Sequence, residues 1–204
     1  NKTVVQEINR LEFSPQMVRL GTGELDPRLF PADMMKEALS RVASSIESLG
    51  YPEPLGLERL RKAVSRHLEK IGIIAPPSSI LITSGALQAL QLISASLLEG
   101  GSVVYTERPT YLNSLRVFQS AGLRLTGVAM DAQGISMASL QNIVPLSSAK
   151  TDAVLYTIPT NHNPTGRTMT ADRRYALLKF CANRRLPIIE DGAYQLSLIH
   201  ISEP

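Results

Sequence analysis

The sequence of 204 residues has few of the residues that build disulfides and metal sites. Cys181 is its one cysteine, so neither a disulfide framework nor a cysteine-based metal site can form within the chain. The three histidines, His67, His162 and His200, are dispersed and give a zinc site almost no support. Lys and Arg outnumber Asp and Glu by only 21 to 18 and are scattered, which argues against a nucleic-acid-binding face.

Long apolar runs, low-complexity tracts and flexible linkers are also missing. The apolar stretches fall well short of the roughly 20 residues that cross a membrane, and no signal peptide opens the chain. Hydrophobic residues make up 44% and charged residues 19%, as in ordinary globular proteins. We therefore expect a cytoplasmic protein without a membrane partner, long enough to bury a sizeable core.

Apolar residues recur at helical spacing in two segments of the first third of the chain. The spacing of Met35, Leu39 and Val42 predicts one helix, which Gly50 closes. A second predicted helix runs over 57–71 and stops at Gly72. Because no strand signals alternate with helices before Gly50, we interpret residues 1–48 as an N-terminal arm and part of a smaller domain.

From residue 79 onwards, short apolar runs alternate with amphipathic segments. The runs predict strands at 79–83, 102–106, 123–130, 152–158 and 186–190, and the segments between them predict helices at 86–98, 111–121, 137–144 and 171–184. This alternation is typical of an α/β fold with three layers, in which helices cover both faces of a mostly parallel sheet. We expect this large domain to occupy residues 49–195.

Polar residues follow the last two predicted strands. Asn163 lies in the string PTNHNPTG, and Asp191 and Tyr194 lie in the string EDGAY. The carboxyl ends of parallel strands meet at one edge of a sheet, where ligands bind. An amide, a carboxylate and a phenol that converge there suit a pyridoxal phosphate ring.

Six motifs together resemble the class I and II aminotransferases of fold type I, which use pyridoxal phosphate. They are GTGELD at 21–26, GYPEPLG at 50–56, ITSGALQAL at 82–90, RPTY at 108–111, NPTG at 163–166 and EDGAY at 190–194. Each string alone is weak, because Asn, Pro and Gly are common in turns. Six in order are specific, and they are most similar to the aminotransferase-like domain of MocR-type GntR regulators.

The resemblance implies contacts with the cofactor ring. Asp191 would face the pyridine nitrogen and keep it protonated. Asn163 and Tyr194 would hydrogen-bond the phenolic oxygen, and Tyr111 would stack on the ring face. Asn163 would also lie near the substrate, an amino acid or a 2-oxo acid.

The resemblance also implies a phosphate site and a dimer. Gly85, Ala86 and Leu87 open a predicted helix, whose free amides would hold the phosphate. Tyr51 would reach the phosphate of the partner subunit in a homodimer. Gly23 would lie near the carboxylate of the substrate.

The chain departs from the family pattern after Asp191. The family binds the cofactor covalently through a Lys tens of residues further on, and only 13 residues follow Asp191, none of them Lys or Arg. We therefore interpret the chain as a fragment with a cofactor cradle but no catalytic residue, inactive by itself and poorly soluble because its sheet is incomplete. Residues 196–204 lose the resemblance abruptly, and we interpret them as a non-native tail.

The motifs leave three functions open. The nominal one is an aminotransferase, which moves an amino group between an amino acid and a 2-oxo acid. The alternative is the pyridoxal-phosphate-sensing effector domain of a MocR-type regulator with a DNA-binding domain upstream, which the strings at 20–25 and 117–122 favour. A third is a degenerate relative without cofactor. We further interpret His162 as a solvated loop residue and Cys181 as core packing.

Overall fold

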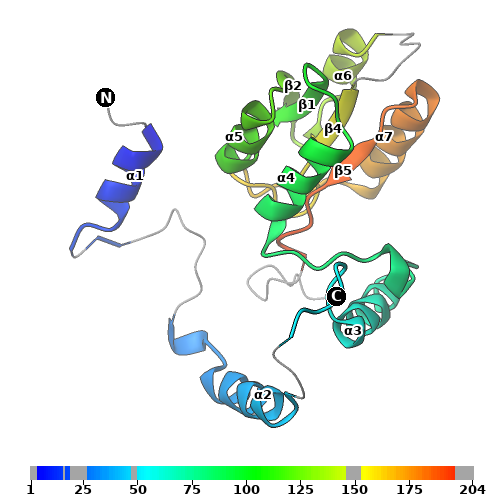
Figure 1. Cartoon of the computed structure of the whole chain (residues 1–204). Helices are drawn as coiled ribbons and strands as arrows, with labels where there is room; N and C mark the ends of the chain where they lie inside the picture. Colours follow the sequence, from blue (N-terminus) through cyan, green and yellow to red (C-terminus); the bar gives the residue numbers. More distant parts are fainter. Residues whose placement is uncertain (1–3, 16, 19–26, 47–49, 146–152, 196–204) are drawn as a thin grey trace. The chain divides into compact units, whose positions relative to one another are not determined.

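In the computed structural model of the chain, the described residues are 4–15, 17–18, 27–46, 50–145 and 153–195. The chain divides into two compact units, residues 1–51 and 52–204 (Figure 1). The assignment of residues 1–48 to an arm and a small domain, and of 49–195 to a cofactor-binding domain, stays a prediction. Gly23 and the tail at 196–204 lie outside the described residues.

The first unit is helical in its described part. It contains α1 (Val4–Glu12), the 3-10 helix η1 (Pro27–Leu29) and α2 (Ala32–Ser44). Helix α2 confirms the helix predicted from Met35, Leu39 and Val42, whereas α1 was not predicted. None of the residues of α2 is buried. Its apolar face is therefore open in the described part of the chain.

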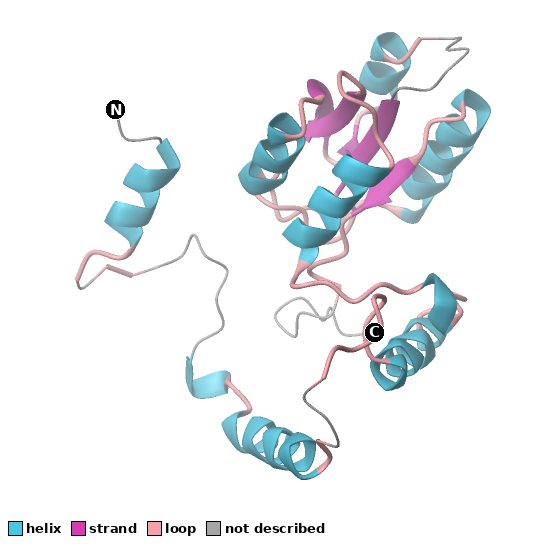
Figure 2. Ribbon diagram, in the orientation of Figure 1, coloured by secondary structure: helices cyan, strands magenta, loops and turns pink. Residues whose placement is uncertain are grey.

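The second unit is built on a five-stranded sheet, drawn in magenta in Figure 2. Its strands are β1 (Val103–Arg108), β2 (Arg124–Asp131), β3 (Gly134–Ile135), β4 (Ala153–Thr157) and β5 (Ile188–Glu190). They lie in the order β3-β2-β1-β4-β5. All neighbours are parallel except the short β3, which pairs antiparallel with β2 and was not predicted. The mostly parallel sheet expected from the sequence is confirmed.

The helical segments α3 (Glu58–Lys70), η2 (a 3-10 helix, Pro77–Ser79) and α4 (Ala86–Ser96) precede β1. The connections between strands contain α5 (Leu112–Ser120) after β1, α6 (Met137–Ile143) after β3 and α7 (Ala171–Arg184) after β4. The predicted bounds of α7 are the observed ones, and those of α3, α4, α5 and α6 differ by one or two residues. The 3-10 helix η2 was not predicted.

Two apolar clusters lie on the two faces of the sheet, because side chains of a strand alternate between faces. Val104 and Val154 belong to a cluster with residues of α4 and α5. Tyr105 and Leu155 belong to a second cluster with residues of α6 and α7. Cys181 lies in this second cluster and is 2% exposed, which confirms its packing role. The three-layer arrangement is therefore confirmed.

The strand predicted at 79–83 is wrong. Ser79 ends η2, and Ile80 has extended dihedrals (φ −113°, ψ 125°), but the segment joins no ladder among the described residues. The Ile82 amide instead donates to the Leu55 carbonyl at 3.0 Å. An apolar extended run becomes a strand only where a neighbouring strand supplies hydrogen-bond partners, which a local pattern does not encode.

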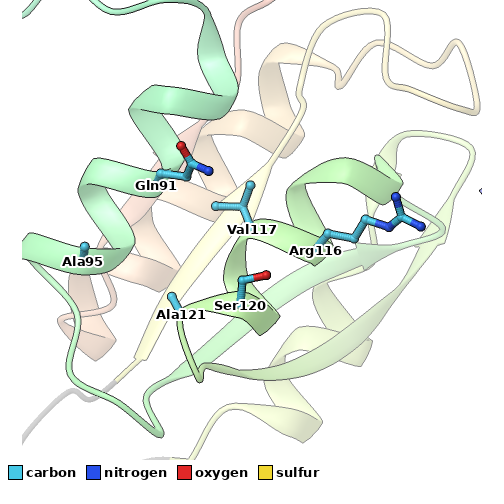
Figure 3. Close-up of a pocket in the computed structure, with 6 residues that line it drawn as sticks. All are labelled: Gln91, Ala95, Arg116, Val117, Ser120 and Ala121. Carbon is cyan, nitrogen blue, oxygen red and sulfur yellow. The ribbon is translucent and has the colours of Figure 1, made fainter.

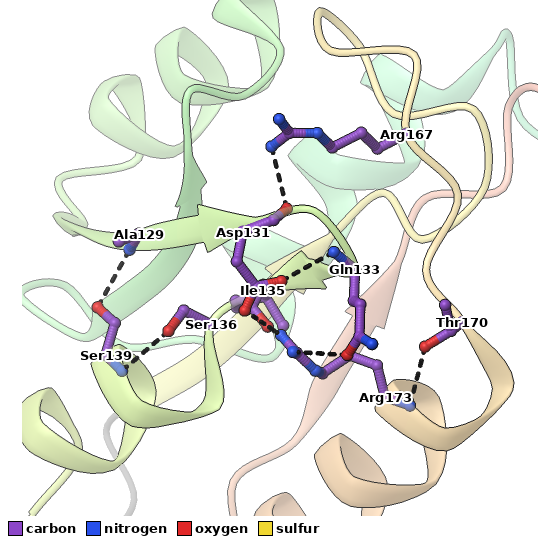
Figure 4. Close-up of polar contacts among 9 residues, drawn as sticks. All are labelled: Ala129, Asp131, Gln133, Ile135, Ser136, Ser139, Arg167, Thr170 and Arg173. Atoms are coloured by element: carbon purple, nitrogen blue, oxygen red, sulfur yellow. Dashed lines mark hydrogen bonds and ion pairs between the residues drawn. The ribbon is translucent and has the colours of Figure 1, made fainter.

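Side-chain caps fix the beginnings of α6 and α7, the two helices that cover the same face of the sheet (Figure 4). The Thr170 hydroxyl accepts from the Arg173 amide at 3.4 Å and caps α7. The Ser136 hydroxyl accepts from the Ser139 amide at 3.3 Å and caps α6. Because each cap satisfies an amide that the helix leaves unpaired, both helices begin at defined residues.

Arg173 ties the first turn of α7 to the turn between β2 and β3 (Figure 4). Its guanidinium lies 2.9 Å from Asp131 Oδ2 and donates to Gln133 Oε1 at 3.0 Å. A further bond runs to the carbonyl of Ile135. Burial opposes ionisation of Asp131, but the hydrogen bond from the Gln133 amide and the Arg173 side chain outweigh it and lower the pKa of the Asp131 carboxyl.

We predict that Asp131→Asn destabilises the fold in a pH-dependent way. Since the folded pKa is lowered, the carboxylate stabilises the fold above its unfolded pKa, about 3.9, and this contribution is lost as the pH falls through the folded value. Urea unfolding at neutral pH should show a loss of about 0.5–1 kcal/mol, because the pair is partly exposed. Arg173→Met should show the same pH profile. A loss that stays constant into acid would contradict the assignment.

Candidate functional site

The parallel sheet brings three predicted site residues to one edge. Tyr111 follows β1 and immediately precedes α5, Asn163 follows β4, and Asp191 follows β5. Strand β4 lies between β1 and β5, and all three run parallel. Their carboxyl ends therefore share the edge at which α/β folds bind ligands.

Asp191 is oriented by two donors. The Tyr156 hydroxyl donates to Oδ2 at 2.7 Å, and the Ala193 amide donates to Oδ1 at 3.2 Å. The Asp191 amide donates to the Thr157 carbonyl at 2.9 Å, which continues the pairing of β4 and β5. An ionised carboxylate has about four acceptor positions, so Asp191 can accept from another donor such as a protonated ring nitrogen.

Tyr156 is fully buried, and its ring contacts Phe118 edge-on at 5.3 Å between centroids. Burial raises the pKa of the Tyr156 phenol far above its usual value. A hydrogen bond with Ser114 opposes this, and the hydrogen bond and charge of Asp191 reinforce it. The phenol therefore stays protonated and donates to Asp191. Tyr156 was not predicted as a site residue, because a tyrosine within an apolar strand has the pattern of an ordinary core residue.

Asn163 is linked to the same side of the sheet. Its Nδ2 donates to the Tyr194 hydroxyl at 3.1 Å. Tyr194 and Tyr111 both pack against the apolar cluster that contains Tyr156, the hydrogen-bond partner of Asp191. Because an amide carries two N–H donors, the bond to Tyr194 leaves a second donor for a ligand oxygen.

The turn before α4 has the geometry predicted for the phosphate. Gly85 has a φ of 88°, a conformation that side-chain-bearing residues rarely adopt, and it immediately precedes the helix. Ala86 and Leu87 are its first two residues, and all three are exposed. The first amides of a helix lack acceptors within it, so this turn can bind an anion through its backbone.

Two predicted residues are not placed relative to this edge. Tyr51 belongs to the first unit and is exposed, and Gly23 lies outside the described residues. Among the described residues, no three His, Cys, Asp or Glu side chains gather as a metal site, and no helix has the length and apolarity that a membrane crossing needs.

The interpretation of His162 as a solvated residue is wrong. Its side chain is 1% exposed, and its Nε2 lies 3.2 Å from Oε2 of Glu107, which is equally buried. The sequence held a signal for this pair, because Glu107 follows the apolar run of β1, and a fully buried carboxylate needs a partner. The partner, His162, could not be found from local pattern, because it follows β4, a strand that is distant from Glu107 in the sequence and adjacent to β1 only in the assembled sheet.

Two cavities have linings that include neither Asp191 nor Asn163. One, of about 430 Å³, lies between α4 and α5 and is lined by Gln91, Ala95, Arg116, Val117, Ser120 and Ala121 (Figure 3). The other, of about 610 Å³, includes His67, Thr160, Arg174 and Glu190 in its lining. Neither is lined by a predicted cofactor residue.

Comparison with known proteins identifies the family. Residues 15–199 match the model of the aminotransferase class I and II family. The chain belongs to this family. The resemblance inferred from the six motifs, including that to MocR-type regulators, is thereby confirmed, and the fold is that of the pyridoxal-phosphate-dependent transferases.

The family relatives fall into two groups. HTH-type transcriptional regulator YdfD of Bacillus subtilis is 47% identical over 96% of this chain and 40% of its own length. HTH-type transcriptional regulator NorG of Staphylococcus aureus is 30% identical over 94% of this chain and 43% of its own. Among solved structures, an archaeal alanine:glyoxylate aminotransferase matches with 33% identity and a TM-score of 0.79, over 92% of this chain and 48% of that one.

A second solved relative is the kynurenine aminotransferase of Pyrococcus horikoshii in complex with PMP, at 31% identity and a TM-score of 0.83. The match covers 94% of this chain and 48% of that one. The chain thus spans less than half the length of these aminotransferase-family relatives.

We predict that Tyr156 does not titrate in the range of ordinary phenols. The rise in phenolate absorbance near pH 10 should be the same for native wild type and Tyr156→Phe, since the buried phenol stays protonated there. After unfolding in urea, the variant should lack one of six phenols. Because the folded pKa is raised, this phenol's contribution to stability is lost above about pH 10. A smaller native rise in the variant would refute the assignment.

Proposed function

We propose that the chain forms part of a pyridoxal 5′-phosphate site in an aminotransferase-fold domain. The observation that carries this proposal is the pair of linked contacts at one sheet edge, Tyr156 to Asp191 and Asn163 to Tyr194. The donors and acceptors left on Asp191 and Asn163 match a ring with a protonated nitrogen and an oxygen. When bound, the cofactor supplies an electron sink for bonds broken at the substrate's α-carbon.

Each residue of the edge then has a binding role. The Asp191 carboxylate accepts a hydrogen bond from the protonated ring nitrogen, and Tyr156 keeps that carboxylate oriented. Asn163 and Tyr194 hold the phenolic oxygen, and Tyr111 stacks on the ring. The amides of Gly85, Ala86 and Leu87 bind the phosphate.

We propose that the domain carrying this site is the effector-sensing domain of a longer HTH-type regulator. Two HTH-type regulators of Bacillus subtilis are 46–47% identical to this chain over 95–96% of its length, whereas the two solved aminotransferases named above are 31–33% identical. In this view DNA is bound by another segment. The whole protein is a cytoplasmic homodimer, in which Tyr51 reaches the phosphate of the partner subunit.

Transamination of an amino acid with a 2-oxo acid is the second candidate. Its support is the close similarity of the backbone to aminotransferases, with TM-scores of 0.79 and 0.83. The family's covalent anchor is a Lys beyond the Asp, and none follows Asp191 in this chain. The chain by itself is therefore expected not to catalyse transamination, whichever function the whole protein has.

Asp191→Ala tests the cofactor site in protein that extends through the rest of the fold. Pyridoxal phosphate binding, followed by its visible absorbance, should weaken tenfold to hundredfold, as expected for the loss of a hydrogen bond to a charged group worth about 1.5–3 kcal/mol. Asp172→Asn, which changes an exposed carboxylate on α7, should bind as wild type does. Equal affinity of wild type and Asp191→Ala would refute the site.

Two assays on the same protein separate the candidate functions. A regulator should change its DNA affinity at least severalfold when pyridoxal phosphate is added, without releasing 2-oxo acid from amino acids. An enzyme should form 2-oxo acid catalytically, with no effect of the cofactor on DNA binding. Absence of both responses would reject both functions.

A further inference from the structure

A buried carboxylate lies near the end of β1 and is none of the groups that the proposed function places against the cofactor. Glu107, in β1, is 1% exposed. Its Oε1 accepts from the Thr157 hydroxyl at 2.7 Å, and its Oε2 accepts from the Ile158 amide at 2.9 Å. Such a carboxylate costs several kcal/mol of desolvation unless its partners satisfy it. Both partners lie where β4 ends, so Glu107 fixes the start of the loop that carries Asn163.

His162 extends this contact into the loop. Its Nε2 lies 3.2 Å from Glu107 Oε2, and its Nδ1 lies 2.9 Å from the Thr165 hydroxyl and accepts from the Thr165 amide at 3.4 Å. Because a backbone N–H can only donate, the ring proton lies on Nε2, the atom that faces Glu107. The imidazole therefore spans the turn from β4 to Thr165.

The His162 backbone holds the same turn. Its carbonyl accepts from the Gly166 amide at 2.6 Å, and its amide donates to the Arg167 carbonyl at 2.8 Å. Nε2 lies 3.2 Å from Glu107 Oε2, and it is a buried polar atom without a hydrogen-bond partner among the described residues. The two side chains are thus close together and buried.

Glu107 also lies near the two chain segments that carry the proposed ring contacts Tyr111 and Asn163. It is four residues before Tyr111 and one residue beyond the paired positions Thr106 and Tyr156 of β1 and β4. Side chains alternate along a strand, so Glu107 follows Tyr105 onto the face covered by α6 and α7. Asn163 instead reaches Tyr194 on the opposite face. One turn is therefore anchored on one face and presents its amide on the other.

We propose that Glu107 and His162 are positioning residues that set the Asn163 amide against the ring oxygen of pyridoxal phosphate. They touch no part of the proposed cofactor site themselves and act through the turn of residues 162–166. This inference rests on the proposed cofactor site and adds to it a buried carboxylate–imidazole pair.

Variants of Glu107 and Asn163 test the proposal in protein that extends through the rest of the fold. Glu107→Gln keeps the size and one acceptor oxygen, but it removes the charge and puts a donor NH2 in place of the other oxygen. Glu99→Gln changes an exposed carboxylate and serves as the control. We expect Glu107→Gln to weaken pyridoxal phosphate binding about tenfold and to shift the absorbance maximum of the bound cofactor. His162→Gln should have the same two effects. Loss of second-layer support typically has effects of this size. Glu99→Gln should match wild type.

A double-mutant cycle shows whether the pair acts through Asn163. Adding Glu107→Gln to Asn163→Ala should weaken cofactor binding no further, because the amide that Glu107 positions is already absent. Additive losses would overturn the proposal. The proposal would also be overturned if Glu107→Gln left the affinity and the absorbance maximum unchanged and only lowered the melting temperature of the cofactor-free protein. Glu107 would then be a purely structural residue.

The same titrations separate this inference from the cofactor site itself. If wild type binds no pyridoxal phosphate, the proposed function fails, and the positioning role fails with it. If wild type binds and Asp191→Ala does not, while Glu107→Gln and His162→Gln bind as wild type does, only the positioning role is overturned. Circular dichroism of each cofactor-free variant identifies any that fails to fold, and His162→Gln then replaces Glu107→Gln in the cycle.

Discussion

The register of three parallel strands is the constraint on which the site depends. Strand β1 pairs residue by residue with β2 and β4, and β4 pairs with β5. A slip of one residue would turn every side chain of a strand to the opposite face. Tyr156 would then leave the α4 and α5 side, and its bond to Asp191 would be lost. The apolar alternation that builds the two clusters therefore also places the polar groups.

Short connections preserve this placement beyond the strands. Asp191 follows β5 directly and stays bonded to the Thr157 carbonyl, so it is nearly a part of the sheet. Asn163 follows β4 by a few residues, and its turn is held from both sides by backbone bonds. Groups on such short, bonded segments keep their geometry without ligand, which lowers the cost of ordering when a ligand binds.

The parts of the fold that depend on local pattern could be predicted from sequence. Helix α7 shows this, since a capping Thr170 and a long amphipathic stretch define it without reference to the rest of the chain. The run at 79–83 failed because pairing is decided by distant residues. The order of the six motifs likewise located Asn163 and Asp191, since turn and strand-end chemistry is local.

What the sequence did not reveal are the residues whose role depends on a distant partner. Tyr156 has the pattern of core, and only the position of Asp191 turns its hydroxyl into a donor. His162 has the pattern of a loop, and only Glu107 makes its burial understandable. In both pairs the two residues lie on different strands or loops, so neither can be interpreted until the sheet is assembled.

Stability alone does not account for these buried polar groups. Phenylalanine could also pack against Phe118, and apolar residues in place of Glu107 and His162 would avoid the desolvation of a buried carboxylate and an imidazole. All three lie within one residue of the ends of β1 and β4 or in the loop that follows β4, next to Asn163 and Asp191. Polar groups at a net cost, concentrated at one edge of the sheet, are expected where a fold must hold ligand-binding groups in fixed positions.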